Sequence, residues 1–306
     1  MHTLLLAVLW GLLVPAAGLA AGGPTTRPIN FWVLCPDRLA VPPPRSLELC
    51  QECVRAHRQG DSKALQRAMH ELGEYPVAVE LSSAESARRF ALPGGDRPIL
   101  EYSELSFGEG GHGSKTWGAG VALAIWTQCH APFVSGRRVL ELGSGVGVGG
   151  LSAALAGAAH VTLSDVAEDE RWPGLSTRLQ ANLAANAQTN GVGEATAAVA
   201  LDWDSCLPAD YAPERTYPRL IGSDLAYDER SVDALAAAVV KHLEPGGEAC
   251  LIKCAAPTRQ TPPGGFAPFA HVHLCRERAA CAGATGRPPP RRLPSSMHCA
   301  AATQAS

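Results

Sequence analysis

Several protein classes are excluded by what this sequence lacks. Its 306 residues carry a formal net charge of −3, without the basic excess that is typical of nucleic-acid-binding chains. Its ten cysteines have no regular spacing, so they indicate neither a disulfide framework nor a redox compartment. No Gly-Lys-Ser or Gly-Lys-Thr follows its glycine-rich turn, which excludes a Walker phosphate loop. What remains is a chain long enough for one large domain with extensions.

A metal site is also not supported. Cys50 and Cys53, followed by His57, have the spacing of half a zinc site. A structural zinc site needs four ligands, and no second half is evident in the sequence. We therefore expect an incidental pair of cysteines on a helix, and no bound metal.

The amino-terminal residues 1–23 form an apolar run that ends in small residues. Gly18-Leu19-Ala20 suits a signal peptidase, so we predict a signal peptide over residues 1–21 and entry into the secretory pathway. The positively charged start of such a peptide is missing, because only His2 precedes the run. An organelle leader, a membrane anchor and a misplaced start codon, which leaves a cytoplasmic protein, remain alternatives. We expect no stable membrane association unless this segment is retained.

Residues 22–104 form a predicted N-terminal extension that is partly helical. Apolar residues at three- and four-residue steps predict a helix over residues 47–72, which Gly60-Asp61-Ser62 interrupts and splits in two. Three shorter elements are expected after it, namely a strand at 77–81, a helix at 85–90 and a strand at 99–102.

Residues 105–256 alternate between expected helices and strands. The expected strands are 139–142, 160–164, 196–201, 220–222 and 248–253. The expected helices are 116–129, 147–155, 175–190 and 232–243. Because each strand is almost wholly apolar and helices separate the strands, we predict an α/β domain whose mostly parallel sheet is covered on both faces.

A glycine-dense turn follows the first of these strands. Glu141, Gly143, Gly145 and Gly147 give the pattern acid-x-Gly-x-Gly-x-Gly. Glycine has no Cβ, so such a turn brings the backbone close to a ligand. A strand, turn and helix of this kind open nucleotide-binding α/β folds, although the dinucleotide pattern fits only from Gly145 onward, too late after the strand. A tight turn without any ligand remains the alternative.

Polar and aromatic residues stand at the ends of the later strands. Asp165 ends the second strand, where a carboxylate accepts both hydroxyls of a ribose or, alternatively, caps the next turn. Trp203 follows the third strand, where an indole packs on adenine or lies in the core. Asp224 and Tyr227 follow the fourth, at the edge where open α/β sheets bind ligands. The alternative for this last pair is a helix start beside a packing tyrosine.

These features together resemble the seven-β-strand protein methyltransferases with an Asp-x-x-Tyr motif, mainly protein-lysine methyltransferases. The match covers about residues 105–255. Five segments carry it in order, namely Gly113–Leu123, Val139–Gly145, Val161–Asp165, Leu179–Asn182 with Asn186, and Asp202-Trp203 leading to Gly222–Tyr227. The resemblance implies a Rossmann-like methyltransferase sheet, S-adenosylmethionine (SAM) as the cofactor and a lysine of a protein as the substrate.

The resemblance also implies roles for individual residues. Trp117 borders the entrance for cofactor or substrate, and Trp203 lies by adenine. The cofactor-binding residues are then Trp117, Glu141, Gly143, Gly145, Gly147, Asp165 and Trp203. Asp224 orients the incoming amine and Tyr227 walls its channel, so these two are the catalytic candidates. No dedicated general base is identified.

The middle of the Asp-x-x-Tyr motif separates two substrate classes. Enzymes that methylate amino groups of DNA or RNA usually carry Pro-Pro there, beside the aromatic residue on which a base stacks. This chain has Leu225-Ala226 instead. We therefore expect a protein partner and no nucleic acid.

The resemblance fails after the fifth strand, where the family sheet continues with a helix and a two-stranded hairpin. Residues 257–306 contain eight prolines and six arginines, without helical periodicity, so we expect a disordered tail. Only residues 269–274 have a strand-like pattern, and the hairpin is expected to be incomplete. A non-catalytic scaffold with a degraded domain is therefore an alternative function, as is a methyltransferase acting on small molecules or nucleic acid.

Overall fold

The computed structural model describes residues 4–15, 30–35, 44–83, 86–94, 96, 98–167, 173–203, 216–226, 229–254 and 268–276. Its strands are β1 (Leu4–Pro15), β2 (Asn30–Cys35), β3 (Val77–Ser83), β4 (Ala87–Ala91), β5 (Ile99–Ser103), β6 (Arg138–Leu142), β7 (His160–Asp165), β8 (Thr196–Ala200), β9 (Tyr217–Ser223), β10 (Leu243–Cys254) and β11 (Pro268–Arg276). Its helices are α1 (Pro44–Gln59), α2 (Ser62–Leu72), α3 (Phe107–Gly110), η1 (Gly111–Ser114), α4 (Gly118–Cys129), α5 (Ala131–Val134), α6 (Val148–Leu155), α7 (Leu175–Thr189), η2 (Gly193–Ala195) and α8 (Glu229–His242).

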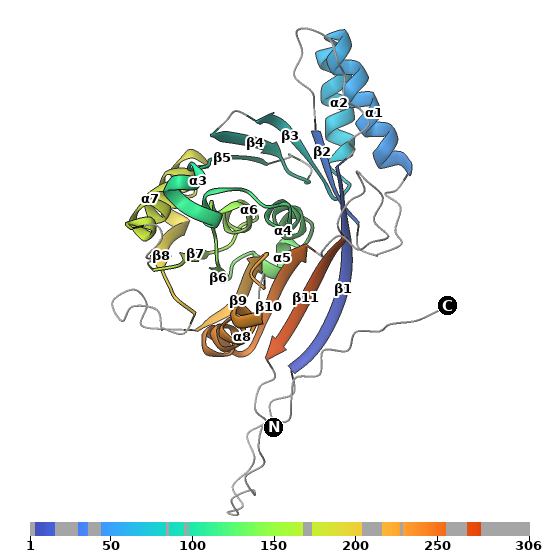
Figure 1. The fold of residues 1–306 in the computed structure, drawn as a ribbon. Coiled ribbons are helices and arrows are strands. Elements are labelled where there is room, and N and C mark those ends of the chain that lie inside the picture. Colours follow the sequence, from blue (N-terminus) through green and yellow to red (C-terminus); the bar gives the residue numbers. More distant parts are fainter. Residues whose placement is uncertain are drawn as a thin grey trace, which may run out of the picture.

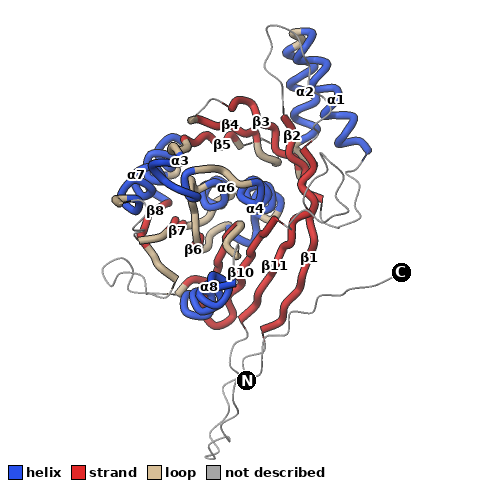
Figure 2. The backbone as a smooth tube through the Cα atoms, viewed as in Figure 1, coloured by secondary structure: helices blue, strands red, loops and turns tan. Residues whose placement is uncertain are grey.

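Five parallel strands form the centre of the fold, in the order β8-β7-β6-β9-β10. Strand β6 occupies the middle because Val139, Leu140 and Leu142 are all fully buried, and a parallel strand must be apolar on both faces. Helices cover both faces of these strands, as Figure 2 shows for α4 and α6 on one side and α8 on the other. The predicted α/β, Rossmann-like architecture is confirmed.

The sheet extends beyond the five parallel strands, which corrects the expectation of an incomplete sheet. Strand β11 pairs antiparallel with β10, and β1 pairs antiparallel with both β11 and β2. The strand-like segment 269–274 therefore lies within a longer strand of the predicted tail. Residues 4–15, which belong to the predicted leader, stand beside β11, where a second hairpin strand was missing. Whether these residues also act as a leader stays a prediction.

The whole sheet follows the order β5-β4-β3-β2-β1-β11-β10-β9-β6-β7-β8 and curves around two helices. Figure 1 shows α4 and α6 inside this curve, with β3 to β5 on one side and β9 to β11 on the other. Both helices are rich in small apolar residues and pack against each other. Because nearly every face of α4 is buried, this helix is the centre of the larger apolar core.

In its described residues, the N-terminal extension contributes a helical hairpin and the four strands β2 to β5. Helices α1 and α2 are separated at Gly60, as the sequence predicts, and Asp61 caps α2 by accepting a hydrogen bond from the N–H of Ala64 at 2.9 Å. Their apolar sides, including the buried Cys50 and Cys53, pack against β3 in a separate cluster. None of the described helices has the length and apolarity to cross a bilayer.

The helix predicted over residues 85–90 is wrong, because most of this segment forms strand β4. It pairs on one side with β3 and on the other with β5. Arg88 of β4 donates to the buried carboxylate of Glu80 at 2.8 Å and lies 3.5 Å from that of Glu104. Pairing on both sides therefore outweighs the weak local preference of a short segment for helix.

Candidate functional site

The glycine-dense turn between β6 and α6 adopts a conformation that requires glycine. The φ angles of Gly143, Gly145 and Gly147 are 60°, 54° and 89°, a region that side chains rarely occupy. Helix α6 begins directly afterwards, at Val148. The turn therefore presents bare backbone and a helix start at the carboxyl end of the central strand, a cradle that fits a nucleoside cofactor.

Glu141 lies behind this turn and is only 2% exposed. A Cβ placed on Gly149 or Gly150 of α6 would collide with its carboxylate oxygens, which explains why two glycines open that helix. Burial raises the pKa of Glu141 to about 8, and the nearby Ser144 hydroxyl and Gly150 N–H lower it only in part. Oε2 of Glu141 and Oγ of Ser144 complete no hydrogen bond within the described residues. Glu141 thus supports the turn from inside the domain.

Asp165, at the end of β7, holds the turn from its other side. Its Oδ2 accepts a hydrogen bond from the N–H of Gly145 at 2.6 Å, and its Oδ1 accepts one from Val166 at 2.8 Å. Burial raises the pKa of Asp165, and the two backbone N–H groups oppose this. Each carboxylate oxygen has a second lone pair, so each can still accept a hydrogen bond from a hydroxyl ligand.

Trp203 and Leu225 meet the turn from the next strand ends. A Cβ on Gly143 would lie 3.9 Å from the indole of Trp203 and would collide with Leu225. Both side chains belong to the apolar cluster on the α8 side of the sheet. Asp202, beside Trp203, accepts a hydrogen bond from the N–H of Ala167 at 3.0 Å and so joins the ends of β7 and β8.

Trp117 stands at the start of α4, after a segment that crosses over the glycine turn. It is 51% exposed, and its indole N–H donates to the carbonyl of His112 at 3.0 Å. The carbonyl oxygen of Gly113 lies 3.1 Å from the position that a Cβ on Gly145 would occupy. The backbone of this segment therefore packs closely against the glycine turn. Glu104 fixes the segment by accepting a hydrogen bond from the N–H of Thr116 at 3.0 Å.

Asp224 follows β9 in a backbone conformation that is uncommon for a residue with a side chain. Its φ is 55°, and its N–H donates to the carbonyl of Ile252 at 2.8 Å. Strained positions of this kind concentrate at functional sites, where the surrounding structure holds them. The preceding residue, Ser223, lies beside Gly120 of α4, the helix whose N-cap is Trp117. Tyr227 lies outside the described residues.

The structure brings Glu141, Gly143, Gly145, Asp165 and Trp203 together at adjoining strand ends. Sequence reasoning named Gly113, Leu225 and Asn186 within its matching segments but assigned none of them a contact with the turn. Asn186 was noticed only as part of a resemblance, and its spacing from Asn182 was the available signal.

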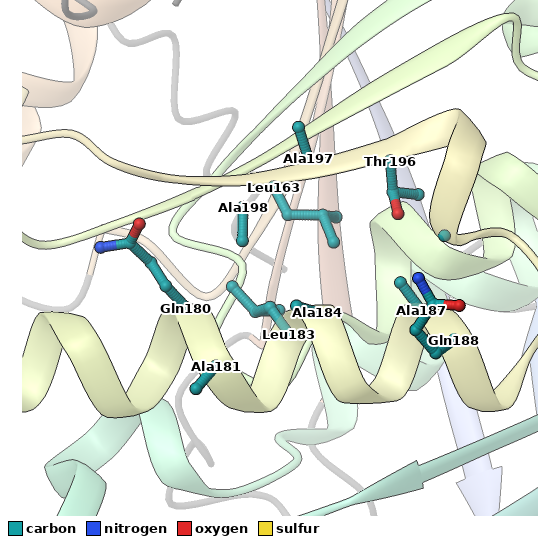
Figure 3. A pocket seen from close by; sticks show the side chains of 11 residues that line it. Leu163, Gln180, Ala181, Leu183, Ala184, Ala187, Gln188, Thr196, Ala197 and Ala198 are labelled. Atoms are coloured by element: carbon teal, nitrogen blue, oxygen red, sulfur yellow. The ribbon is translucent and has the colours of Figure 1, made fainter.

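A cavity of about 380 Å³ lies elsewhere, between α7 and strands β7 and β8 (Figure 3). Its apolar lining includes Leu163, Leu183, Ala184, Ala187, Ala197 and Ala198. None of the predicted site residues lines it. Short alanine side chains between a helix and an edge strand leave such space, so we do not place the site there.

Several curated protein-lysine methyltransferases are similar to this chain. The chain is 34% identical over 138 residues to protein N-lysine methyltransferase METTL21A of Danio rerio, which is 45% of this chain and 58% of that protein. It is 33% identical over 101 residues to protein-lysine N-methyltransferase EEF2KMT of Homo sapiens, or 33% of this chain and 30% of that protein. Protein-lysine N-methyltransferase EFM3 of Chaetomium thermophilum is 29% identical over 192 residues, 58% of this chain and 55% of that protein.

The alignments leave part of each relative unmatched, since the chain spans between 30% and 58% of their lengths. Among solved structures, an O-methyltransferase family protein from Burkholderia thailandensis has a TM-score of 0.37 at 12% identity, over 53% of this chain and 60% of that chain. The family model for lysine methyltransferases matches residues 96–261, which is more than half of the chain. The chain therefore belongs to the lysine methyltransferase family.

Proposed function

We propose that this protein transfers a methyl group from SAM to the side-chain amine of a lysine in another protein. Its family is that of the lysine methyltransferases, and the relatives METTL21A, EEF2KMT and EFM3 carry that activity in their names. The observation that carries the proposal is the glycine turn held by Asp165 at the carboxyl end of the central strand.

The cofactor would lie across the carboxyl ends of β6, β7 and β8. Gly143, Gly145 and Gly147 would accommodate its methionine portion, and the free lone pairs of Asp165 would accept its ribose hydroxyls. The indole of Trp203 would pack on adenine. When bound, the sulfonium of SAM supplies a methyl group that its own positive charge activates. Glu141 supports this site through the turn and α6 rather than from the surface.

The residues after β9 would receive the substrate. A lysine ammonium has a pKa of about 10.4 in water and must lose a proton before it attacks. Asp224 attracts and orients this group, Trp117 borders the entrance, and Tyr227 walls the channel. Alignment and removal of water then account for much of the acceleration, because the methyl group needs no further activation. No general base is assigned.

The main argument for a non-catalytic scaffold was an incomplete sheet. The described strands β11 and β1 occupy the positions that were expected to be missing. We therefore prefer the hypothesis of an active methyltransferase to that of a scaffold. The two middle residues of the Asp-x-x-Tyr motif, Leu225-Ala226, differ from the Pro-Pro that is usual in enzymes acting on DNA or RNA, which argues against a nucleic-acid substrate.

Calorimetry with SAM and with S-adenosylhomocysteine (SAH) tests the cofactor half of the proposal. We expect saturable binding of both at micromolar concentration. Well-folded protein that binds neither at millimolar concentration would contradict the proposal. Transfer of a radiolabelled methyl group to proteins of a cell extract tests the other half, with acid hydrolysis to identify methyl-lysine. Label found in nucleic acid, or in methyl-arginine, would point to another substrate class.

A further inference from the structure

Strand β5 forms one edge of the curved sheet, and its outer side carries peptide groups that need partners. It pairs with β4 through its inner side, with Leu100 opposite Phe90 and Tyr102 opposite Arg88. In an edge strand every second residue turns both its N–H and its C=O outward, and here those residues are Glu101 and Ser103. An uncovered edge of this kind would invite pairing with another chain.

Three asparagines of helix α7 and its C-cap meet these outward groups. Asn190 accepts from the N–H of Glu101 at 2.9 Å and donates to its carbonyl at 2.5 Å. Asn186 accepts from the N–H of Ser103 at 2.8 Å and donates to its carbonyl at 3.1 Å. Asn182 donates to that same carbonyl at 3.1 Å. We call Asn182, Asn186 and Asn190 the asparagine ladder.

The spacing of the asparagine ladder matches the strand. Four residues of a helix rise about 6.0 Å, and two residues of a strand rise about 6.8 Å. A carboxamide carries one C=O and one N–H₂, so it pairs with an exposed peptide group as another peptide would. Figure 1 shows α7 beside β5, and α7 also contacts β8, the strand at the opposite end of the curved sheet. The asparagine ladder therefore stands in for a neighbouring strand.

Asn186 makes one more contact, which reaches the candidate site. Its Nδ2 also donates to the carbonyl of Val146 at 3.1 Å, inside the glycine turn and between Gly145 and Gly147. Asn186 is 2% exposed, so no water competes freely for these bonds. One carboxamide thus joins the outer edge of β5 to the turn. Neither Asn182 nor Asn190 contacts the turn in the hydrogen bonds described.

We propose that Asn186 is a positioning residue that fixes the glycine turn for the cofactor, and that the asparagine ladder makes strand β5 part of the support of that site. This inference rests on the proposed function for its affinity readout. Its physical basis is the hydrogen bond from the buried amide of Asn186 to the carbonyl of Val146. Every other residue of the turn Gly143–Gly147 is glycine or serine. Such a turn has high conformational entropy when unrestrained, so a single fixed carbonyl limits it strongly.

The test compares Asn186→Ser with Asn182→Ser in the full chain. Both changes shorten a nearly buried asparagine of the asparagine ladder. Asn182→Ser removes one hydrogen bond to Ser103, whereas Asn186→Ser removes two hydrogen bonds to Ser103 and the bond to Val146. We expect both to lower the melting temperature. The dissociation constant for SAH should rise about tenfold or more in Asn186→Ser and stay within twofold in Asn182→Ser. Equal affinities in the two variants would overturn the proposal.

Hydrogen exchange of the ligand-free protein gives a second readout that needs no cofactor. The N–H of Gly147 donates to the carbonyl of Ser144 at 2.7 Å, and its protection reports the closure of the turn. Exchange there should be faster in Asn186→Ser than in Asn182→Ser. If the wild-type protein fails to bind SAH, the proposed function fails, while this exchange comparison still decides the role of Asn186.

Asn186→Asp provides a second test in case Asn186→Ser fails to fold. A protonated aspartate keeps one donor for Val146 and one acceptor for Ser103, whereas the ionised form offers only acceptors. Its affinity for SAH, taken relative to wild type at each pH, should therefore recover as the pH falls from 8 to 5. A ratio that does not change with pH would contradict the assigned hydrogen bond.

Discussion

The glycine turn and the α1–α2 hairpin are both rich in carboxylates, yet they use them in opposite ways. At the turn, Glu141 and Asp165 are buried, and burial raises the pKa of each. On the hairpin, the exposed guanidinium of Arg45 meets Glu48, Glu52 and Glu71, and the pKa of Glu71 is lowered by its hydrogen bonds with Arg45.

The difference indicates where the function lies. A buried carboxylate is costly, and proteins keep one where an ion pair offsets the cost, as Arg88 does for Glu80, or where a site requires it. An exposed ion pair costs little and contributes little, because water and salt screen it. The turn is therefore the region whose residues we expect to be intolerant of change, and the hairpin surface the tolerant one. Four predictions test this contrast.

The largest effect is expected from Asp224→Asn. Asparagine tolerates the left-handed backbone of this position, so the fold should persist, while the charge that orients the lysine is lost. Methyl transfer should fall about 100-fold or more with SAH affinity within twofold. The matched control is Asp202→Asn after strand β8, where the amide oxygen still accepts from Ala167. Equal activity in both variants would remove Asp224 from the site.

Gly143→Ala should weaken cofactor binding about tenfold and also destabilise the protein. The added methyl group meets Leu225 and lies beside Trp203, in a backbone region that costs alanine about 1–2 kcal/mol. Gly136→Ala is the control, because its φ of 65° imposes the same strain while no other atom lies within 4 Å. Calorimetry with SAH should show normal affinity in that variant. Similar affinities for the two would show that the turn does not approach the cofactor.

These contacts also show what the sequence reveals about the site. The strand ends and the turn follow local patterns, since apolar runs, glycines and the residues that follow them stand together in the sequence. The buried partners of the turn do not. Leu225 meets Gly143, and Asn186 meets Val146, across segments that only the packing of the sheet brings together.

Strand pairing was the weaker part of the sequence prediction for a similar reason. Strands β6 to β10 are apolar enough to be identified alone, whereas β4 has a mixed pattern that its two neighbours decide. Strand β11 lies in a proline-rich segment whose composition hides it. Roles that depend on a single residue, such as that of Tyr227, stay predictions.

Glu141→Gln should change how stability depends on pH. With a folded-state pKa of about 8 against an unfolded value near 4.5, Glu141 keeps a proton in the folded state that the unfolded chain releases. The free energy of unfolding should therefore fall as pH rises from about 5 to 8, by about 1 kcal/mol per pH unit. Glutamine cannot ionise, so the variant should lose most of this slope. Urea denaturation at pH 5, 6.5, 8 and 9 measures it, and parallel wild-type and variant profiles would contradict the burial of a protonated Glu141.

Arg45→Ala is expected to change least, although it removes more ion pairs than any change above. Arg45 contacts three carboxylates, with its closest approach at 2.8 Å to Glu71, but its side chain is 40% exposed and these attractions are screened. The hairpin is held instead by the apolar cluster beneath it, which includes the buried Leu49 and Leu72. We expect the melting temperature to shift by less than about 2 °C, with SAH affinity unchanged. A larger loss in low salt that disappears in 1 M salt, and that Arg45→Lys does not share because lysine keeps the charge, would show that exposed charge supports this fold as much as burial does.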